Sequence, residues 1–327
     1  MPPLGTAQYI QRLAAGIDAE RPGLFGECLS ALARLGIRTD YDLLLQPDVL
    51  EQAPAAVHRP IRALRMAVLD RFACAGATAA DLLQQQQPGG DRAPAASGIR
   101  PLDALLDGGA WAGGIVEVCG DDAAVNTRVA VEFAVGHLAR GGDRVDGRAF
   151  LLQSSPPAVW LIEAAVRRRL GAQAQLAAQA MERISVVDCS DLDALLAFLF
   201  HYADTDPGAT ADLLVIDSIR PLVIGAMQQH DGGHVAVHAV KTALRAVTAP
   251  RRPLPAAVLI TNGVSRRPAP GDAPPGRPAV QPSLGAAWAL VSHVHVHLSA
   301  DVPDGGYTAT IIKSPSTHVG RQCRFAL

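Results

Sequence analysis

Cysteine, charge and long apolar runs are all scarce in this chain. Its five cysteines are scattered without a close pair, which excludes a disulfide framework and a zinc site of ordinary spacing. No run approaches the ~20 apolar residues that a membrane helix needs. The N-terminal residues, which include Asp18 and Glu20, resemble neither a signal peptide nor a transit peptide. We therefore expect a soluble intracellular protein in a reducing compartment, with no membrane partner.

The near-neutral net charge excludes a protein that binds nucleic acid non-specifically through a large overall positive charge. Of the 327 residues, 18% are charged and 49% are hydrophobic, and the formal net charge is -2. A local basic groove stays compatible with these figures. The length is sufficient for one sizeable core and a small further domain.

Two breaks in composition divide the chain. Apolar residues recur at helical spacing over residues 28–73, which predicts a small helical N-terminal domain at 1–75. Residues 76–97 are rich in Gln, Pro, Gly and Ala and cannot bury a core, so they are predicted to form a flexible linker. Residues 98–327 then form the main domain.

The main domain alternates short runs rich in β-branched residues with helical patterns, which is typical of a parallel α/β sheet flanked by helices. The last two runs, "HVHVHL" and "YTATIIK", alternate strictly and predict antiparallel strands at one side. Helices are expected over residues 127–139, 157–170, 192–203 and 235–247. The other expected strands are "GIVEVC", "AFLLQ", "ISVVDC", "DLLVID" and "AAVLITN".

The stretch "GDDAAVNT", which follows the first predicted strand, has the outline of a phosphate-binding loop without its chemistry. Such a loop needs glycine-rich backbone N–H groups, a lysine for the phosphates and a Ser or Thr hydroxyl for magnesium. Gly120 and Thr127 stand at the right separation, but Val125 replaces the second glycine and Asn126 replaces the lysine. The loop is therefore predicted to be structural.

Two acidic residues in the same turn, Asp121 and Asp122, also oppose a triphosphate. Like charges at contact distance cost roughly 1–4 kcal/mol each. The two carboxylates would instead serve as caps for the helix that follows. No cofactor is expected, and ATP with magnesium is the alternative.

One feature of a nucleotide site is better preserved. The run "ADLLVID" ends in Asp217, where a carboxylate holds magnesium-bound water in phosphate-loop enzymes. A turn-forming Asp-Ser pair at the end of a strand explains this residue equally well.

These stretches resemble the core of RecA-type recombinases. "SGIRPLDALLDGGAWAGGIVEVCG" is similar to the segment that precedes the phosphate loop in that family. "LLVIDSIRPLV", "VLITNGV", "LGAAWALVSHVHVHL" and "IIKSP" follow in the order and spacing of the family. The helical N-terminal domain and linker resemble the eukaryotic Rad-fifty-one paralogues, and the D-type most of all. The resemblance covers nearly the whole chain.

The resemblance implies a RecA-like fold with a vestigial nucleotide site at Gly120, Thr127 and Asp217. The family's catalytic glutamate would fall in "LLQSSPP", which has no acid, and Gly263 replaces the family's γ-phosphate-sensing glutamine. With both loop replacements, these departures predict that the chain does not hydrolyse ATP. No catalytic residue is assigned.

The resemblance also implies two loops that face DNA. The first lies around "SIRPLVIGAMQQHDGGH" and the second spans residues 265–282. Arginines on flexible loops suit contact with the backbone of single-stranded DNA, although neither loop carries an aromatic residue for base stacking. A solvated, disordered insertion is the alternative for the second loop. The candidate DNA-binding residues are Arg220, Arg266, Arg267 and Arg277.

Two further clusters have simpler interpretations. His293, His295 and His297 could bind zinc or copper, but the polar side of a half-buried strand accounts for them, and no metal site is predicted. The arginines at 167–169 end a predicted helix, where cations favour the macrodipole. A solvated helix end is preferred to a DNA contact.

The predicted function is that of a non-catalytic recombinase paralogue in homologous recombination repair. It would bind sister paralogues, or the recombinase itself, together with single-stranded DNA, and would assist assembly of the recombinase filament in the nucleus. Two alternatives stay open: a DNA-stimulated ATPase of the RecA type with an atypical phosphate loop, and an interaction module that binds neither ATP nor DNA. Salt-dependent binding of single-stranded DNA separates the last of these from the others.

Overall fold

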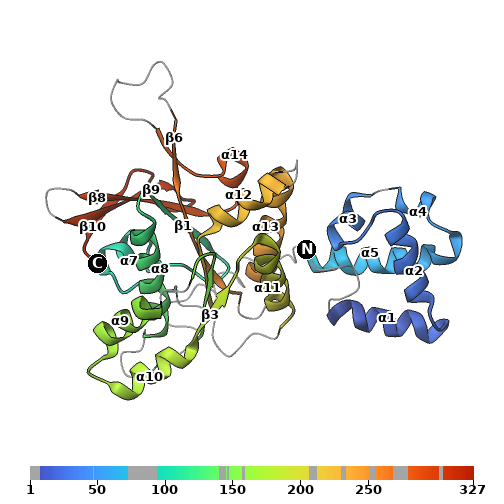
Figure 1. The fold of residues 1–327 in the computed structure, drawn as a ribbon, viewed down its shortest axis with the longest axis horizontal. Coiled ribbons are helices and arrows are strands. Elements are labelled where there is room, and N and C mark those ends of the chain that lie inside the picture. Colours follow the sequence, from blue (N-terminus) through green and yellow to red (C-terminus); the bar gives the residue numbers. More distant parts are fainter. Residues whose placement is uncertain are drawn as a thin grey trace.

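The computed structural model of the chain describes residues 8–46, 48–72, 94–139, 145, 147–156, 159–205, 212–229, 233–249, 255–267, 279–301 and 305–327. These residues form a group of short N-terminal helices and a RecA-like α/β core built on one large sheet (Figure 1). None of the described helices is long and apolar enough to cross a bilayer.

The N-terminal helices enclose an apolar cluster of their own, which includes the fully buried Ile10, Leu32 and Ile61. A capping box begins one of them: the Thr39 hydroxyl accepts from Asp42 N, and the Asp42 carboxylate accepts from Thr39 N. The helices are α1 (Gln8–Glu20), α2 (Leu24–Arg34), α3 (Asp40–Leu45), α4 (Val49–Gln52), the 3-10 turn η1 (Ala55–Val57) and α5 (His58–Phe72).

Eight strands form the central sheet in the order β10-β9-β8-β1-β5-β4-β2-β3. Strands β1 to β5 and β8 pair in parallel, whereas β8, β9 and β10 pair antiparallel. The mainly parallel α/β fold is confirmed, but β8 lies parallel to β1 and is antiparallel only to β9. The strands are β1 (Ile115–Gly120), β2 (Ala149–Gln153), β3 (Ile184–Asp188), β4 (Leu213–Asp217), β5 (Ala257–Asn262), β8 (Val294–Asp301), β9 (Gly306–Lys313) and β10 (Gln322–Phe325).

Helices cover both faces of the sheet, because successive strand residues point to opposite sides. In β4, Leu213 and Val215 pack toward α8 and α9, while Leu214 and Ile216 pack toward α11 and α13. Figure 1 shows these two helical layers on either side of the strands. The helices of the core are α7 (Arg100–Leu105), α8 (Ala123–Leu138), α9 (Val159–Leu170), α10 (Ala174–Arg183), α11 (Leu192–Asp204), α12 (Ile219–Gln229), α13 (Gly233–Thr248) and α14 (Gly285–Trp288).

Both segments that were expected as DNA-facing loops contain regular structure. Helix α12 occupies the first, because Ile219, Leu222 and Val223 recur at helical spacing and are buried against the core. The ends of the second segment pair antiparallel as β6 (Val264–Arg267) and β7 (Ala279–Pro282). Residues 268–278, which include Arg277, lie outside the described residues.

The last residues of the predicted linker pack onto the core. Ala95 and Ala110 exchange backbone hydrogen bonds of 2.5 and 3.0 Å. The backbone N–H and the hydroxyl of Ser97 both donate to the Asp103 carboxylate over 2.7 Å. Residues 76–93, which make up most of that predicted linker, lie outside the described residues.

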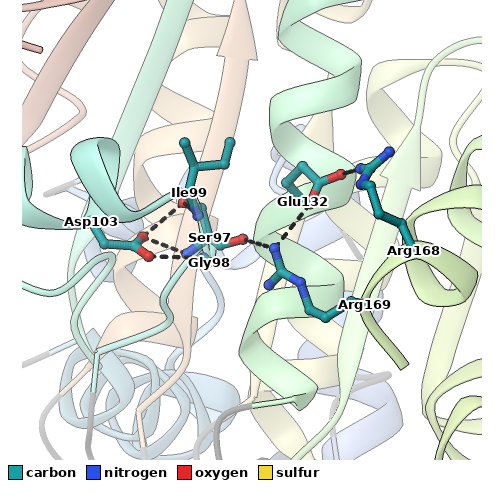
Figure 2. Close-up of polar contacts among 7 residues, drawn as sticks. All are labelled: Ser97, Gly98, Ile99, Asp103, Glu132, Arg168 and Arg169. Atoms are coloured by element: carbon teal, nitrogen blue, oxygen red, sulfur yellow. Dashed lines mark hydrogen bonds and ion pairs between the residues drawn. The ribbon is translucent and has the colours of Figure 1, made fainter. Parts of the chain in front are cut away.

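A buried carboxylate on α8 joins this segment to α9 (Figure 2). Glu132 is 6% exposed and forms ion pairs with Arg168 and Arg169. Arg169 also donates to the backbone O of Ser97 over 2.8 Å. The arginines at the end of α9 are therefore not simply solvated, since two of them neutralise Glu132 and one holds the incoming chain.

Close packing of this segment against Gly136 of α8 gives a stability prediction. A Cβ added at Gly136 would lie 2.5 Å from the backbone O of Ala96, which cannot move freely. Gly136→Ala should therefore destabilise the protein by about 1–3 kcal/mol, as overpacked cores do. Chemical denaturation measures this change.

Gly225→Ala in α12 is the matched control, because an added Cβ there meets nothing within 4 Å. Alanine is the better helix former, so this control should be neutral or stabilising by up to about 1 kcal/mol. Equal effects of the two substitutions would contradict the packing described for Gly136.

Candidate functional site

Side chains of the protein itself bond to the backbone of the turn after β1. Helix α8 begins at Ala123, and not near Thr127 as the sequence suggested. The Asp122 carboxylate caps it and accepts from the backbone N–H groups of Ala124 and Val125, over 2.9 and 3.4 Å. In a phosphate loop these residues would form the cradle of inward-pointing N–H groups. Here they are wound into the helix, and the predicted capping by an aspartate is confirmed for Asp122.

Asn126 takes the place of the phosphate-binding lysine and forms a link between strands. Its side chain is 4% exposed, and Nδ2 donates to the backbone O of Asn262 over 3.1 Å and of Gly120 over 3.4 Å. Its Oδ1 has no hydrogen-bond partner among the described residues. A Cβ on Gly120 would lie 2.9 Å from this Oδ1 and 3.0 Å from the backbone O of Leu298, so a larger residue would force these neighbours to shift.

No lysine of the chain lies beside Asn126. The sequence has two lysines, Lys241 and Lys313, and both are described. Lys313 Nζ donates to the backbone O atoms of Ala289 and Ser292, over 2.7 and 2.5 Å. Lys241 lies in α13, which covers the face of the sheet opposite α8. The chain therefore does not supply the missing charge from another lysine of its own.

Thr127 and Asp217 meet directly at the carboxyl ends of β1 and β4. Thr127 Oγ1 donates to Asp217 Oδ2 over 2.8 Å, and Thr261 Oγ1 donates to Oδ1 over 2.6 Å. Asp217 is 5% exposed. Burial raises the pKa of its carboxyl, while hydrogen bonds from Thr261, Thr127 and Gln153 lower it in part. The two residues that would share a magnesium ion in a nucleotide site instead bond to each other.

Gln153 ends β2 near the place where the resemblance would put a catalytic glutamate. It lies opposite Asp217 in the sheet register and is buried. Its amide carries no charge and cannot serve as a general base. The sequence predicted that this strand end carries no acidic residue. In the described structure, the uncharged Gln153 lies at the end of β2.

A second buried carboxylate, Glu117 in the middle of β1, organises the centre of the sheet. Its side chain is fully buried. Oε1 accepts from Asn262 Nδ2 over 2.7 Å and from Trp288 Nε1 over 2.9 Å, and Oε2 accepts from Ser292 Oγ over 2.7 Å. Burial raises the pKa of Glu117, against the lowering effect of these three donors. Sequence reasoning missed this cluster, although an acid inside an apolar strand was its signal.

Of the three histidines, only His295 belongs to this interior cluster, whereas His293 is exposed and His297 is half-buried. His295 lies opposite Glu117 in the register, with Nε2 3.3 Å from Oε2. Burial, reinforced by Lys313, lowers the pKa of His295 to about 4, so the ring is neutral near pH 7. His293 Nδ1 accepts from Ile115 N over 2.9 Å. Within the described ranges, no three His, Cys, Asp or Glu residues gather to hold a metal ion.

The β6–β7 hairpin leaves the sheet at a foot formed by Gly263 and Ser283, where Ser283 N donates to Gly263 O over 2.9 Å. The exposed Arg220 of α12 lies across this foot, because a Cβ on Gly263 would meet its Cδ at 3.2 Å. Arg266 and Arg267 lie in β6. Three of the four arginines proposed from the sequence are thus placed at or beside the hairpin, and Arg277 lies outside the described residues.

No family model matches this chain, but similar proteins are known. "DNA repair protein RAD51 homolog 4" of Bos taurus is 26% identical over 318 residues, and the protein of the same name from Mus musculus is 26% identical over 320. Each match covers 92% of this chain and 91% of the relative. Over nearly its whole length the chain is therefore similar to D-type paralogues of the RecA/RAD51 family. In this chain, the turn after β1 is filled by an aspartate cap and an asparagine.

Titration offers a test of the buried carboxyl group of Asp217. The raised pKa of Asp217 means that its carboxylate form is penalised by folding, and this penalty grows as pH rises above the ordinary aspartate range. Asp217→Asn removes the penalty. We expect its unfolding free energy to exceed that of the wild type by about 1–2 kcal/mol at neutral pH. The excess should shrink as pH falls.

Denaturation curves between pH 4 and pH 8 measure this difference, with Asp48→Asn at an exposed position as the charge-matched control. A difference that stays constant with pH, or that grows as pH falls, would contradict the assignment of a penalised carboxylate.

Proposed function

We propose that this D-type paralogue acts in homologous recombination repair in the nucleus as a non-catalytic partner of other recombinase paralogues. The names of the similar proteins as DNA repair proteins support the process. The observation that carries the non-catalytic role is the Asn126 amide, which stands in place of the lysine and is bonded to two backbone carbonyls.

Charge around the turn supports the same conclusion. Asp121 and Asp122 are exposed at the mouth of the turn, and neither lysine of the chain reaches it. A triphosphate would meet carboxylates without a compensating ammonium group, and its contact with backbone N–H groups would require unwinding the first turn of α8. The RecA-like core is retained, with well-packed apolar clusters on both faces of the sheet. We infer that the fold is kept for binding other paralogues or the recombinase.

Recombinant co-expression tests the partner role. The tagged chain should co-purify with at least one RecA-family paralogue of the same organism, and Asn126→Ala should not abolish that association, since the amide is buried inside the turn. If no recombinase paralogue co-purifies, the partner role is wrong, and the nucleotide-free turn needs another explanation.

The foot of the hairpin is the place where we propose contact with single-stranded DNA. Arg220 is exposed there, and no other residue in the described part of the chain forms a hydrogen bond or ion pair with its guanidinium. An arginine of this kind suits a phosphate group, which needs charge more than fixed geometry. Arg266 and Arg267 belong to strand β6, which begins directly after Gly263 at this foot.

Arg220→Ala should weaken binding of single-stranded DNA roughly three- to tenfold and lower the slope of log K against log salt by about 0.7 per lost phosphate contact. Joint replacement of Arg266, Arg267 and Arg277 should lower the slope further. Fluorescence anisotropy with a labelled oligonucleotide at several salt concentrations measures both quantities.

Arg100→Ala is the control, because Arg100 is exposed at the start of α7 and carries the same charge. An equal loss from Arg100→Ala would point to bulk charge. No salt-dependent binding by the wild type would favour an interaction module that binds neither ATP nor DNA.

A further inference from the structure

The chain contains two asparagines, Asn126 and Asn262, and the fold brings them into contact. Asn126 lies in the first turn of α8, and Asn262 is the last residue of β5. Nδ2 of Asn126 donates to the backbone O of Asn262. A side chain of the protein therefore joins the turn after β1 to the end of β5.

Both polar atoms of the Asn262 side chain are hydrogen-bonded. Its Oδ1 accepts from Gly263 N over 2.8 Å. Its Nδ2 donates to Glu117 Oε1 over 2.7 Å and to Ser283 O over 3.2 Å. If the amide were turned over, Oδ1 would face two acceptors, so these contacts fix its orientation.

Asn262 bonds to Gly263 and Ser283, the two residues at which the hairpin leaves the sheet. Gly263 precedes β6, and Ser283 follows β7. One continuous set of contacts therefore runs from Asn126 through Asn262 to both sides of the hairpin foot. The buried Glu117 anchors this set in the middle of β1.

We propose that Asn126 and Asn262 are positioning residues that hold the hairpin foot in one conformation without any nucleotide. In proteins that switch on a nucleotide, contacts to the γ-phosphate order a segment that binds a partner. Here, hydrogen bonds of Asn126 and Asn262 within the chain take the place of those contacts. The hairpin foot therefore keeps one conformation whether or not ATP is present, and its contact with DNA does not respond to ATP. Only this last consequence rests on the proposed function.

Hydrogen exchange of the full-length chain tests the link without relying on DNA. Asn126→Ala removes the amide, and the nearly isosteric Asn126→Asp places an acceptor against two carbonyls. Both variants should exchange about three- to tenfold faster than wild type in peptides that span residues 263–267 and 279–284. Peptides from β2 and β3 should be unchanged.

Thr127→Val is the matched control, because it breaks the neighbouring bond to Asp217 and leaves the Asn126 contact intact. It should not alter exchange at the hairpin foot. Unchanged exchange in both Asn126 variants would overturn the proposal. Faster exchange throughout the sheet, or an equal effect of Thr127→Val at the foot, would also overturn it, since the effect would not be specific to the link.

A second arm adds ATP and magnesium to the wild type. Exchange at the hairpin foot should stay the same, and slower exchange would mean that nucleotide does the positioning. DNA binding is measured separately by anisotropy. A failure to bind DNA would refute the proposed DNA contact while leaving the link intact, so the two failures can be distinguished.

Discussion

The centre of this fold depends on how the chain passes from β1 into α8. In a phosphate loop, a long glycine-rich turn joins the strand to the helix, and the backbone N–H groups at the helix N-terminus stay available to a ligand. Here the Asp122 cap shortens it, and the Asn126 amide bonds it to the end of β5. The Asn126 side chain packs against Gly120, where a larger residue would force neighbours to shift. The turn that holds phosphates in a phosphate loop is therefore occupied here by hydrogen bonds within the protein.

Two buried carboxylates accompany this closed turn, and neutral donors satisfy both. Asp217 accepts from Thr127 and Thr261, and Glu117 accepts from an amide, an indole and a hydroxyl. Removing a carboxylate from water costs free energy, and each hydrogen bond that its oxygens accept offsets part of that cost. The same donors tie β1 to β5 and to the segment before β8. The polar centre of the sheet therefore adds specific cross-links between these elements to the packing of the apolar layers.

The sequence was sufficient to predict strands β1 to β5, β8 and β9 and helices α9, α11 and α13, because their apolar periodicity is strong and local. It was not sufficient for the start of α8, where the phosphate-loop pattern concealed an aspartate cap followed by two alanines, which favour a helix. Helix α12 was missed for a similar reason, since the expected loop outweighed its apolar spacing. The Glu117 cluster joins residues 145 to 175 positions apart, and no local pattern reports such contacts.

The most direct test is equilibrium binding of a fluorescent ATP analogue, with magnesium, to the purified native chain. Val125→Gly combined with Asn126→Lys is measured beside it, since glycine loosens the first helical turn and lysine restores the missing charge. The account predicts no saturable binding by the native chain and measurable binding by the double variant. Saturable, magnesium-dependent binding by the native chain would contradict it, because a closed turn without a cation would then still accept a triphosphate.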